Sequence, residues 1–135
     1  MNIVLAILFF LVVLAFDLYS DYKKWITNRS VDHTFEAWQR GVFLVPSVLA
    51  FHMAIPDRGI WSILIVPLPI FFYYWFLFDG IYNKLRGYDW WFLGSDDPDD
   101  AKLDNLLQVV GKTWGKILKI GGIIISTLLY IQLWF

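Results

Sequence analysis

The sequence predicts an all-α polytopic membrane protein, a single domain over residues 1–135 with four transmembrane helices and one cytoplasmic-face amphipathic helix. Hydrophobic residues make up 59% of the chain and charged residues only 17%, whereas soluble domains are about half apolar and about a quarter charged. A chain this short has too much surface to hide that excess of apolar side chains from water. The composition therefore excludes an ordinary soluble domain and a disordered chain.

The apolar residues fall in four stretches, each close to the ~20 residues that cross a hydrocarbon layer of ~30 Å: 2–20, 38–55, 60–78 and 117–135. Backbone amides in lipid must be hydrogen-bonded within their own segment, so each stretch is expected to be helical. Pro46, Pro67 and Pro69 predict kinks in the second and third stretches. The first stretch has neither a basic residue before it nor a small-x-small cleavage site after it, which favours a retained helix over a signal peptide.

The basic residues predict the orientation in the membrane. Ten of the eleven Lys and Arg residues fall in or beside the two long connections, and only Arg58 occupies the short connection 56–59. By the positive-inside rule, both long loops are expected to be cytoplasmic and both termini outside, in the inner (cytoplasmic) membrane. So little chain remains outside that an outer-face receptor, adhesin or hydrolase is excluded. The net charge of -1 argues against a nucleic-acid partner.

A helix start precedes the fourth apolar stretch. Asp97 and Pro98 have the residue types typical of an N-cap and a first helical position. The apolar residues that follow recur at helical spacing, which predicts an amphipathic helix over about 98–114 on the cytoplasmic face of the membrane. The chain is expected to bend into the last span near Gly111 or Gly115, although one continuous helix over 98–135 is the alternative.

Four basic residues are candidate lipid-headgroup anchors at the cytoplasmic boundary. They follow the third span or border the fourth, and they are Arg86, Lys112, Lys116 and Lys119. Such side chains either extend to the interface from an apolar stem or form a binding site for anionic lipid. Gly121 and Gly122 are candidate helix-packing positions in the fourth span, because small residues let helix backbones approach closely.

Three ionisable residues form a candidate ion or polar site. Asp17 and Asp79 each follow a phenylalanine at the cytoplasmic end of a span, and His52 lies near the outer turn. Ionisable groups within a membrane are candidates for a function, but near the interface they also serve to position a helix. The grouping of Asp32, His33 and Glu36 offers a single histidine without a second motif, so we expect no metal site. The sequence has no convergent catalytic group, and we expect no catalytic residues and no cofactor.

After the third apolar stretch, the sequence carries a series of short motifs: Phe-Asp, Tyr-Asn, Arg-Gly and an aromatic-x-Gly turn. The residues are Phe78, Asp79, Tyr82, Asn83, Arg86, Gly87, Phe92 and Gly94. With this series, the stretch from about 74 to 107 resembles small, uncharacterised polytopic membrane proteins of tailed bacteriophages and prophages, in which a span ends in the same order of motifs. The resemblance implies a phage-type inner-membrane protein and transfers no functional residue. At the end of the third span, Gly87 is expected to adopt the left-handed conformation that terminates a helix.

Together these features predict a non-enzymatic membrane protein that contacts lipids and acts by self-association or by binding another membrane protein. A phage-type role, holin-like or in superinfection exclusion, fits that prediction. The alternative is an ion- or proton-translocating channel or transporter that uses Asp17, Asp79 and His52.

Overall fold

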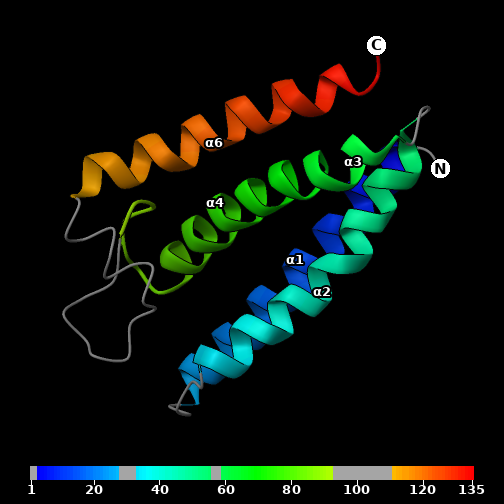
Figure 1. The fold of residues 1–135 in the computed structure, drawn as a ribbon. Helices are drawn as coiled ribbons and strands as arrows, with labels where there is room; N and C mark the ends of the chain where they lie inside the picture. Colours follow the sequence, from blue (N-terminus) through cyan, green and yellow to red (C-terminus); the bar gives the residue numbers. More distant parts are fainter. Residues whose placement is uncertain (1–2, 28–32, 56–58, 93–110) are drawn as a thin grey trace.

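The computed structural model describes residues 3–27, 33–55, 59–92 and 111–135, and over these ranges the chain is helical, with no strand (Figure 1). The helices in chain order are α1 (Ile3–Ile26), α2 (His33–Ala54), α3 (Ile60–Ile65), α4 (Pro67–Leu85) and α6 (Lys112–Gln132). The predicted all-α class is thus confirmed for the described residues.

Three segments are long and apolar enough to cross a membrane: α1, the combined α3 and α4 over Ile60–Leu85, and Thr113–Gln132 of α6. The apolar part of α2, Arg40–Ala54, is shorter. At 1.5 Å per residue it covers only about 22 Å of a hydrocarbon layer that is ~30 Å thick. By their length and composition, these three segments could each span a membrane, as a membrane protein requires.

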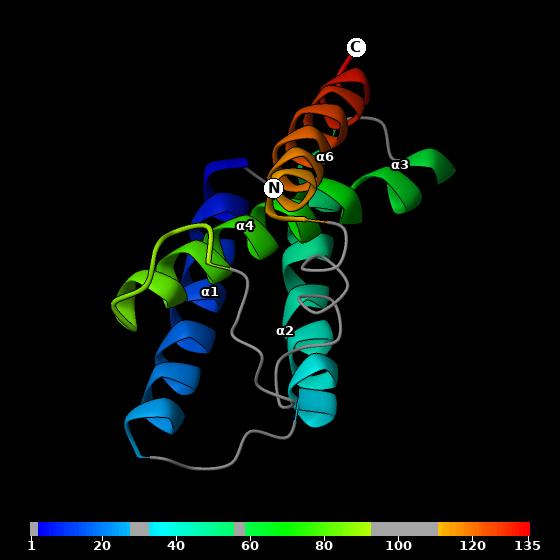
Figure 2. The same ribbon diagram turned by 90° about the vertical axis from the view of Figure 1, so that its left-hand side faces the viewer.

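Helix α4 lies between two other layers (Figures 1 and 2). Helices α1 and α2 run antiparallel as a hairpin on one side of α4, and α6 runs antiparallel to α4 on its other side. The start of α1, the end of α2, helix α3 and the end of α6 all lie at the same end of the molecule. In Figure 1 the hairpin and α4 are close together at that end and diverge toward the opposite end.

The predicted kink in the third span is observed as a break between two helices. Val66 separates α3 from α4, and its backbone N–H donates to the carbonyl of Ser62 at 3.0 Å. Pro67 then occupies the first position of α4, where the missing proline N–H costs no helical hydrogen bond. By contrast, Pro46 lies inside α2, which continues on both sides of it.

Helix α4 extends beyond residue 78, where its apolar run ends, because polar side chains in its last two turns have partners within the protein. It ends at Leu85, and Gly87, two residues later, has a φ of +81°, which confirms the predicted left-handed termination. The N–H of Gly87 donates to Lys84 O at 3.0 Å and the N–H of Tyr88 donates to Asn83 O at 2.8 Å. These two bonds form a Schellman motif.

Helix α6 begins directly after Gly111, which has a φ of +99°. The last three residues of the predicted amphipathic helix, 112–114, therefore belong to the first turn of α6. Residues 98–110 of that helix lie outside the described residues, and the amphipathic helix stays a prediction. The alternative bend at Gly115 is not observed, since this residue lies inside α6.

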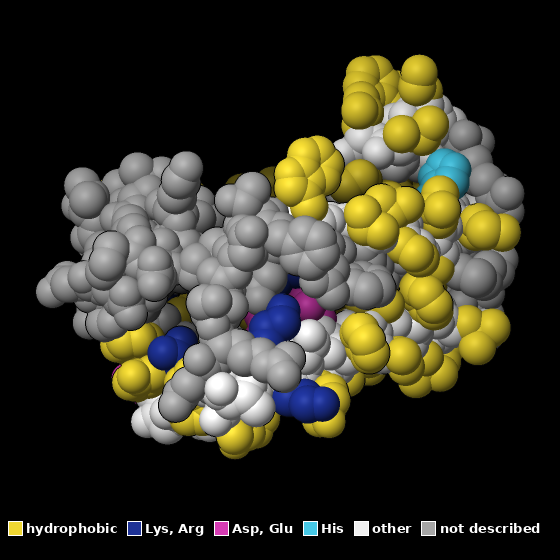
Figure 3. Space-filling model, turned by 90° about the horizontal axis from the view of Figure 1, so that it is seen from below, with side chains coloured by type: hydrophobic (Ala, Val, Ile, Leu, Met, Phe, Trp, Pro, Cys, Tyr) yellow, Lys and Arg dark blue, Asp and Glu magenta, His cyan; other side chains and the backbone are white. Residues whose placement is uncertain are grey.

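The buried core lies between the α1–α2 hairpin and the α3–α4 segment. Its residues from α1 and α4 recur every four positions, so each helix contributes one face. The buried hydrophobic cluster consists of Phe10, Leu14, Leu18, Ile55, Val66, Ile70, Tyr74 and Phe78. Large apolar side chains also cover much of the outer surface, seen in yellow in Figure 3. Such a surface suits contact with lipid rather than water.

Candidate functional site

A group of four charged residues and one tyrosine, here called the Arg40 cluster, joins α1, α2 and α4. It consists of Asp17, Asp21, Lys24, Arg40 and Tyr74. The Arg40 side chain donates through Nη2 to Asp21 Oδ2, and its Nε lies 3.4 Å from Asp17 Oδ2. The Tyr74 hydroxyl donates to the same oxygen of Asp17. Lys24 Nζ lies 3.5 Å from Asp21 Oδ1.

The Arg40 cluster balances its own charge. Asp17 and Asp21 are only 4% and 5% exposed, and an unpaired carboxylate in such a place would be very costly. Arg40 and Lys24 supply two positive charges against these two negative ones. The Arg40 guanidinium also lies 4.4 Å from the centre of the Phe78 ring, a favourable cation–π distance. The cluster can therefore hold three helices together without a net buried charge.

A second ion pair, here called the Lys119 pair, joins the other face of α4 to α6. Lys119 Nζ donates to Asp79 Oδ2, and it lies 4.7 Å from the centre of the Trp75 ring. The Lys119 side chain is 6% exposed and that of Asp79 is 24% exposed. The sequence predicts Lys119 as a headgroup anchor, and in the structure its ammonium is buried and lies against a carboxylate of its own chain.

The face of α6 toward α4 is built from small residues around Lys119. Gly115 and Ser126 are buried, and Gly122 lies between them at helical spacing. A Cβ at Gly122 would lie only 2.2 Å from the Phe72 ring, so the absence of a side chain lets the two helices pack here. A Cβ at Gly121 would meet nothing within 4 Å. Of the two predicted packing glycines, Gly122 thus contacts α4 and Gly121 remains open.

An apolar groove runs between α4 and α6 beside these residues. Its volume is about 370 Å³. Ser126 is the one polar side chain among its lining residues, which are Leu68, Phe72, Ile117, Leu118, Gly121, Gly122, Ile125, Ser126 and Leu129. The chemistry of this groove suits an apolar side chain or a hydrocarbon chain. We refer to it below as the α4–α6 groove.

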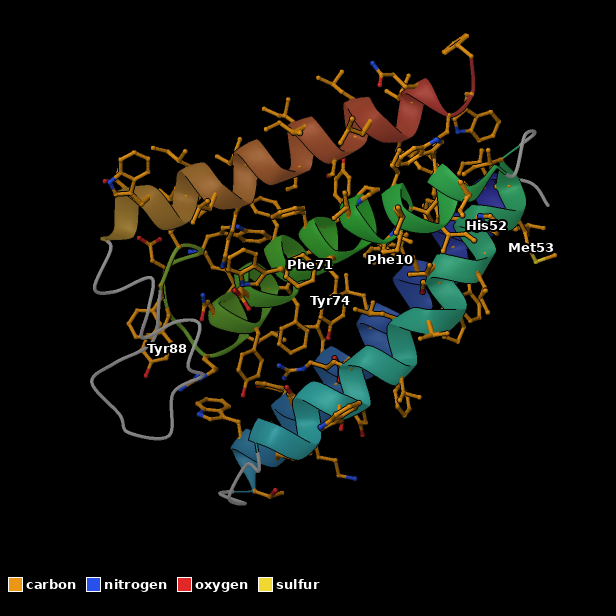
Figure 4. All side chains as sticks on the ribbon, in the orientation of Figure 1. Phe10, His52, Met53, Phe71, Tyr74 and Tyr88 are labelled. Atoms are coloured by element: carbon orange, nitrogen blue, oxygen red, sulfur yellow. The ribbon has the colours of Figure 1, made fainter. Side chains whose placement is uncertain are left out.

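The three residues of the predicted ion or polar site lie in three different contacts. Asp17 belongs to the Arg40 cluster and Asp79 to the Lys119 pair. His52 lies near the end of α2 (Figure 4), where its Nδ1 is 2.9 Å from Ser62 Oγ. The Ser62 hydroxyl donates its only proton to Gly59 O at 2.7 Å, so the His52 ring donates to Ser62 through Nδ1–H. The structure does not bring these three residues together.

The remaining predicted anchors lie at or near the end of α4 and the start of α6. The Arg86 guanidinium lies over three aromatic rings, which are those of Trp25, Tyr82 and Tyr88. Lys116 is exposed, and its Nζ lies 5.3 Å from the centre of the Trp91 ring. Lys112 is the first residue of α6, and its side chain lies outside the described part of the chain.

Sequence reasoning missed the partners of the charged residues. The sequence places Arg40 at the edge of the first loop, within the stretch 38–55, and gives it no partner, whereas in the structure it lies on α2 against Asp21. A usable signal was present, because residues at similar distances from the turn of an antiparallel helical hairpin lie at the same level. Asp21 is five residues before the end of α1 and Arg40 is seven residues after the start of α2.

Two further residues hold the turn that follows α4. A Cβ at Gly80 would lie 2.0 Å from the Trp90 ring, so this indole packs directly on the helix backbone. The Asn83 side chain donates through Nδ2 to Phe92 O at 2.8 Å and to Trp90 O at 3.3 Å. Together they fold residues 88–92 back onto α4.

Over the described residues, no group of three or more His, Cys, Asp or Glu side chains could hold a metal ion. The His33 and Glu36 side chains and all of Asp32 lie outside that part. No protein-family model, curated protein or solved structure matches the chain.

Proposed function

We propose that this protein is a non-enzymatic, four-span protein of the inner membrane that acts by associating with itself or with another membrane protein. The observation that carries the proposal is the α4–α6 groove. It is apolar, it opens beside the unobstructed backbone of Gly121, and transmembrane helices associate where small residues let backbones approach closely.

The position of Gly121 on α6 supports this proposal. Gly122 and Ser126 are already used in packing against α4, whereas Gly121 is turned away from Phe72 and toward open space. Ile117 and Ile125, one turn before and one turn after Gly121, also line the groove. A side chain from another helix fits between these two isoleucines over Gly121, as a knob fits a hole.

Helix α2 supplies the fourth span in this proposal. Its apolar part is short, but the whole helix has 22 residues and is about 33 Å long at 1.5 Å per residue. The charge of Arg40 lies against Asp17 and Asp21 of α1, so it does not prevent α2 from entering the hydrocarbon layer beside α1. Both long connections are then cytoplasmic, as the distribution of basic residues predicts.

The pairing of the membrane charges supports a role without chemistry of its own. The carboxylates of Asp17, Asp21 and Asp79 lie against cations of the same chain. These groups join helices to one another, which leaves the apolar surface for contact with lipids and protein partners. A phage-type function such as holin-like permeabilisation or superinfection exclusion depends on association of this kind.

Cysteine crosslinking in native membranes tests the proposal, since the chain has no cysteine of its own. Gly121→Cys is expected to give a disulfide-linked dimer, or a crosslink to another membrane protein when a bifunctional thiol reagent is used. Val12→Cys is the matched control, because Val12 is 66% exposed on α1 and lies outside the groove. If Gly121→Cys crosslinks no more than Val12→Cys, the groove is not an association surface.

Ion or proton translocation is the second candidate function, and the burial of Asp17 favours it. This carboxylate lies about two-thirds of the way along α1 with a tyrosine hydroxyl and a guanidinium beside it, and intramembrane ionisable groups are common in proton pathways. The flux of ions or protons into proteoliposomes that contain the Asp17→Asn variant should then be lower than with the parent protein. Equal flux in Asp17→Asn, Asp79→Asn and His52→Gln, or none in the parent protein, would exclude this candidate.

A further inference from the structure

Arg86 lies in a cage of three aromatic rings at the end of α4. Its Cζ is 5.1 Å from the ring centre of Tyr88, 5.4 Å from that of Tyr82 and 5.8 Å from that of Trp25. All three distances are within the ~6 Å over which a cation is attracted to an aromatic face. The rings come from α1, α4 and the turn after α4, so the cage exists only in the folded protein.

The charge of Arg86 lies in surroundings different from those of four other described basic residues. Within the described part of the chain, Arg40, Lys119 and Lys24 each lie against a carboxylate, and exposed Lys84 lies 3.7 Å from Asp89. Arg86 has no such ion pair there, and its buried Nε has no hydrogen-bond partner among the described residues. A buried N–H without a partner is costly.

The rings satisfy the charge of Arg86 but not its hydrogen-bond donors. A guanidinium has five N–H groups in a fixed plane and no acceptor. Aromatic faces attract the positive charge but offer no acceptor to the N–H groups at the edge of that plane. A ligand with two acceptor oxygens in one plane, such as a phosphate group, matches this edge in a bidentate arrangement.

The position of the cage in the molecule suits the same ligand. Tyr88 lies beyond the last turn of α4, at the end of the molecule opposite the chain termini (Figure 4). Trp25 is in the last turn of α1 at that same end. Tryptophan and tyrosine are enriched at the level of lipid headgroups, where phosphate groups are abundant.

From these contacts we propose that Arg86, caged by Trp25, Tyr82 and Tyr88, forms a binding site for a phosphate group. The group is that of an anionic lipid headgroup or of a free phosphate anion. The guanidinium supplies the charge and the two donors, and the rings hold its plane in place. The site is independent of the proposed association through the α4–α6 groove.

Native mass spectrometry of the full-length protein with phosphatidylglycerol tests this site. Arg86→Gln is expected to weaken phosphatidylglycerol binding by about tenfold or more, because it removes two charged hydrogen bonds. Arg86→Lys keeps the charge without the planar fork and should give an intermediate loss. Trp25→Leu should also weaken binding although it changes no charge. If binding depended only on surface charge, this substitution would leave it unchanged.

Lys84→Gln is the matched control, since it removes one positive charge from the exposed surface two residues before Arg86. Equal binding by Arg86→Gln and the parent protein would overturn the proposal, and so would an equal loss in Lys84→Gln. Competition with inorganic phosphate separates the two sources of the ligand. Displacement of the lipid identifies a free-anion site, and retention of the lipid identifies a headgroup site. If Arg86→Gln does not fold, Arg86→Lys and Trp25→Leu decide the outcome.

Discussion

The two faces of α4 are attached to their neighbours in different ways. On one face, the Arg40 cluster places two nearly buried carboxylates, a guanidinium and a tyrosine hydroxyl among three helices. On the other face, the Lys119 pair is one ion pair between two helices, and Asp79 keeps 24% of its side chain exposed. The rest of that second interface consists of small residues and an apolar groove.

This difference indicates which part of the molecule can separate from the rest. Loss of Arg40 leaves the carboxylates of Asp17 and Asp21 uncompensated although both are nearly buried, and this is strongly unfavourable. Loss of Lys119 costs less, because water reaches the exposed part of Asp79. We therefore expect α1, α2 and α4 to form the firmly bound unit and α6 to be the element that can rearrange when a partner binds.

Arg40→Met should have the largest effect on stability. It leaves Asp17 and Asp21 in the buried cluster with only Lys24 as a cation, and breaking a buried ion pair from one side costs about 3–5 kcal/mol. The free energy of unfolding, measured by SDS titration in mixed micelles, should fall by that amount. Arg40→Lys keeps the charge and serves as the control. A loss below about 1 kcal/mol in Arg40→Met would mean that the cluster does not hold the helices together.

Gly122→Leu should have the next largest effect, and it tests the apolar part of the second face. A side chain at Gly122 overlaps the Phe72 ring, and overpacking of this kind costs about 1–3 kcal/mol. Gly121→Leu is the neighbouring control and should leave the free energy of unfolding nearly unchanged, since its Cβ meets nothing within 4 Å. Equal losses in the two variants would contradict the packing described for α6.

Much of the fold was predictable from the sequence, because it depends on local signals. The apolar runs predict the helices, Pro67 predicts the break in the third span, and Gly87 predicts the end of α4. Each of these features follows from the covalent properties of one residue or one short run. The apolar run ends at residue 78, but it does not show that the polar residues between it and Gly87 find partners within the protein.

The candidate site was less predictable, because its contacts join residues that are far apart in the chain. The sequence identifies Asp17 and Asp79 as costly charges, but it does not show that Arg40, at the edge of the first loop, and Lys119, a predicted headgroup anchor, pair with them. Tyr74 belongs to an aromatic run in which nothing local distinguishes it from its neighbours. Its role follows only from the packing of α4 against α1, which places its hydroxyl at Asp17.

Lys119→Met should destabilise the protein less than Arg40→Met does. It leaves the Asp79 carboxylate without its partner, but the exposed part of Asp79 lets water compensate, so we expect a loss of about 1–2 kcal/mol. Asp79→Asn in the Lys119→Met background should recover part of that loss, and the double-mutant cycle gives the coupling between the two side chains. If Lys119→Met costs as much as Arg40→Met, α6 is bound as firmly as the hairpin and the contrast between the two faces fails.

Tyr74→Phe should have the smallest effect and separates the hydrogen bond from the packing. The ring of Tyr74 is buried and stacks on Phe78 with 5.4 Å between the ring centres, and phenylalanine preserves both features. Only the hydrogen bond to Asp17 is lost, so the free energy of unfolding should fall by about 1 kcal/mol. In the Arg40→Met background the same change should cost more, because the Tyr74 hydroxyl is then one of the few groups left to stabilise the Asp17 carboxylate. Strict additivity of the two substitutions would instead show that the hydroxyl and the guanidinium act on Asp17 independently.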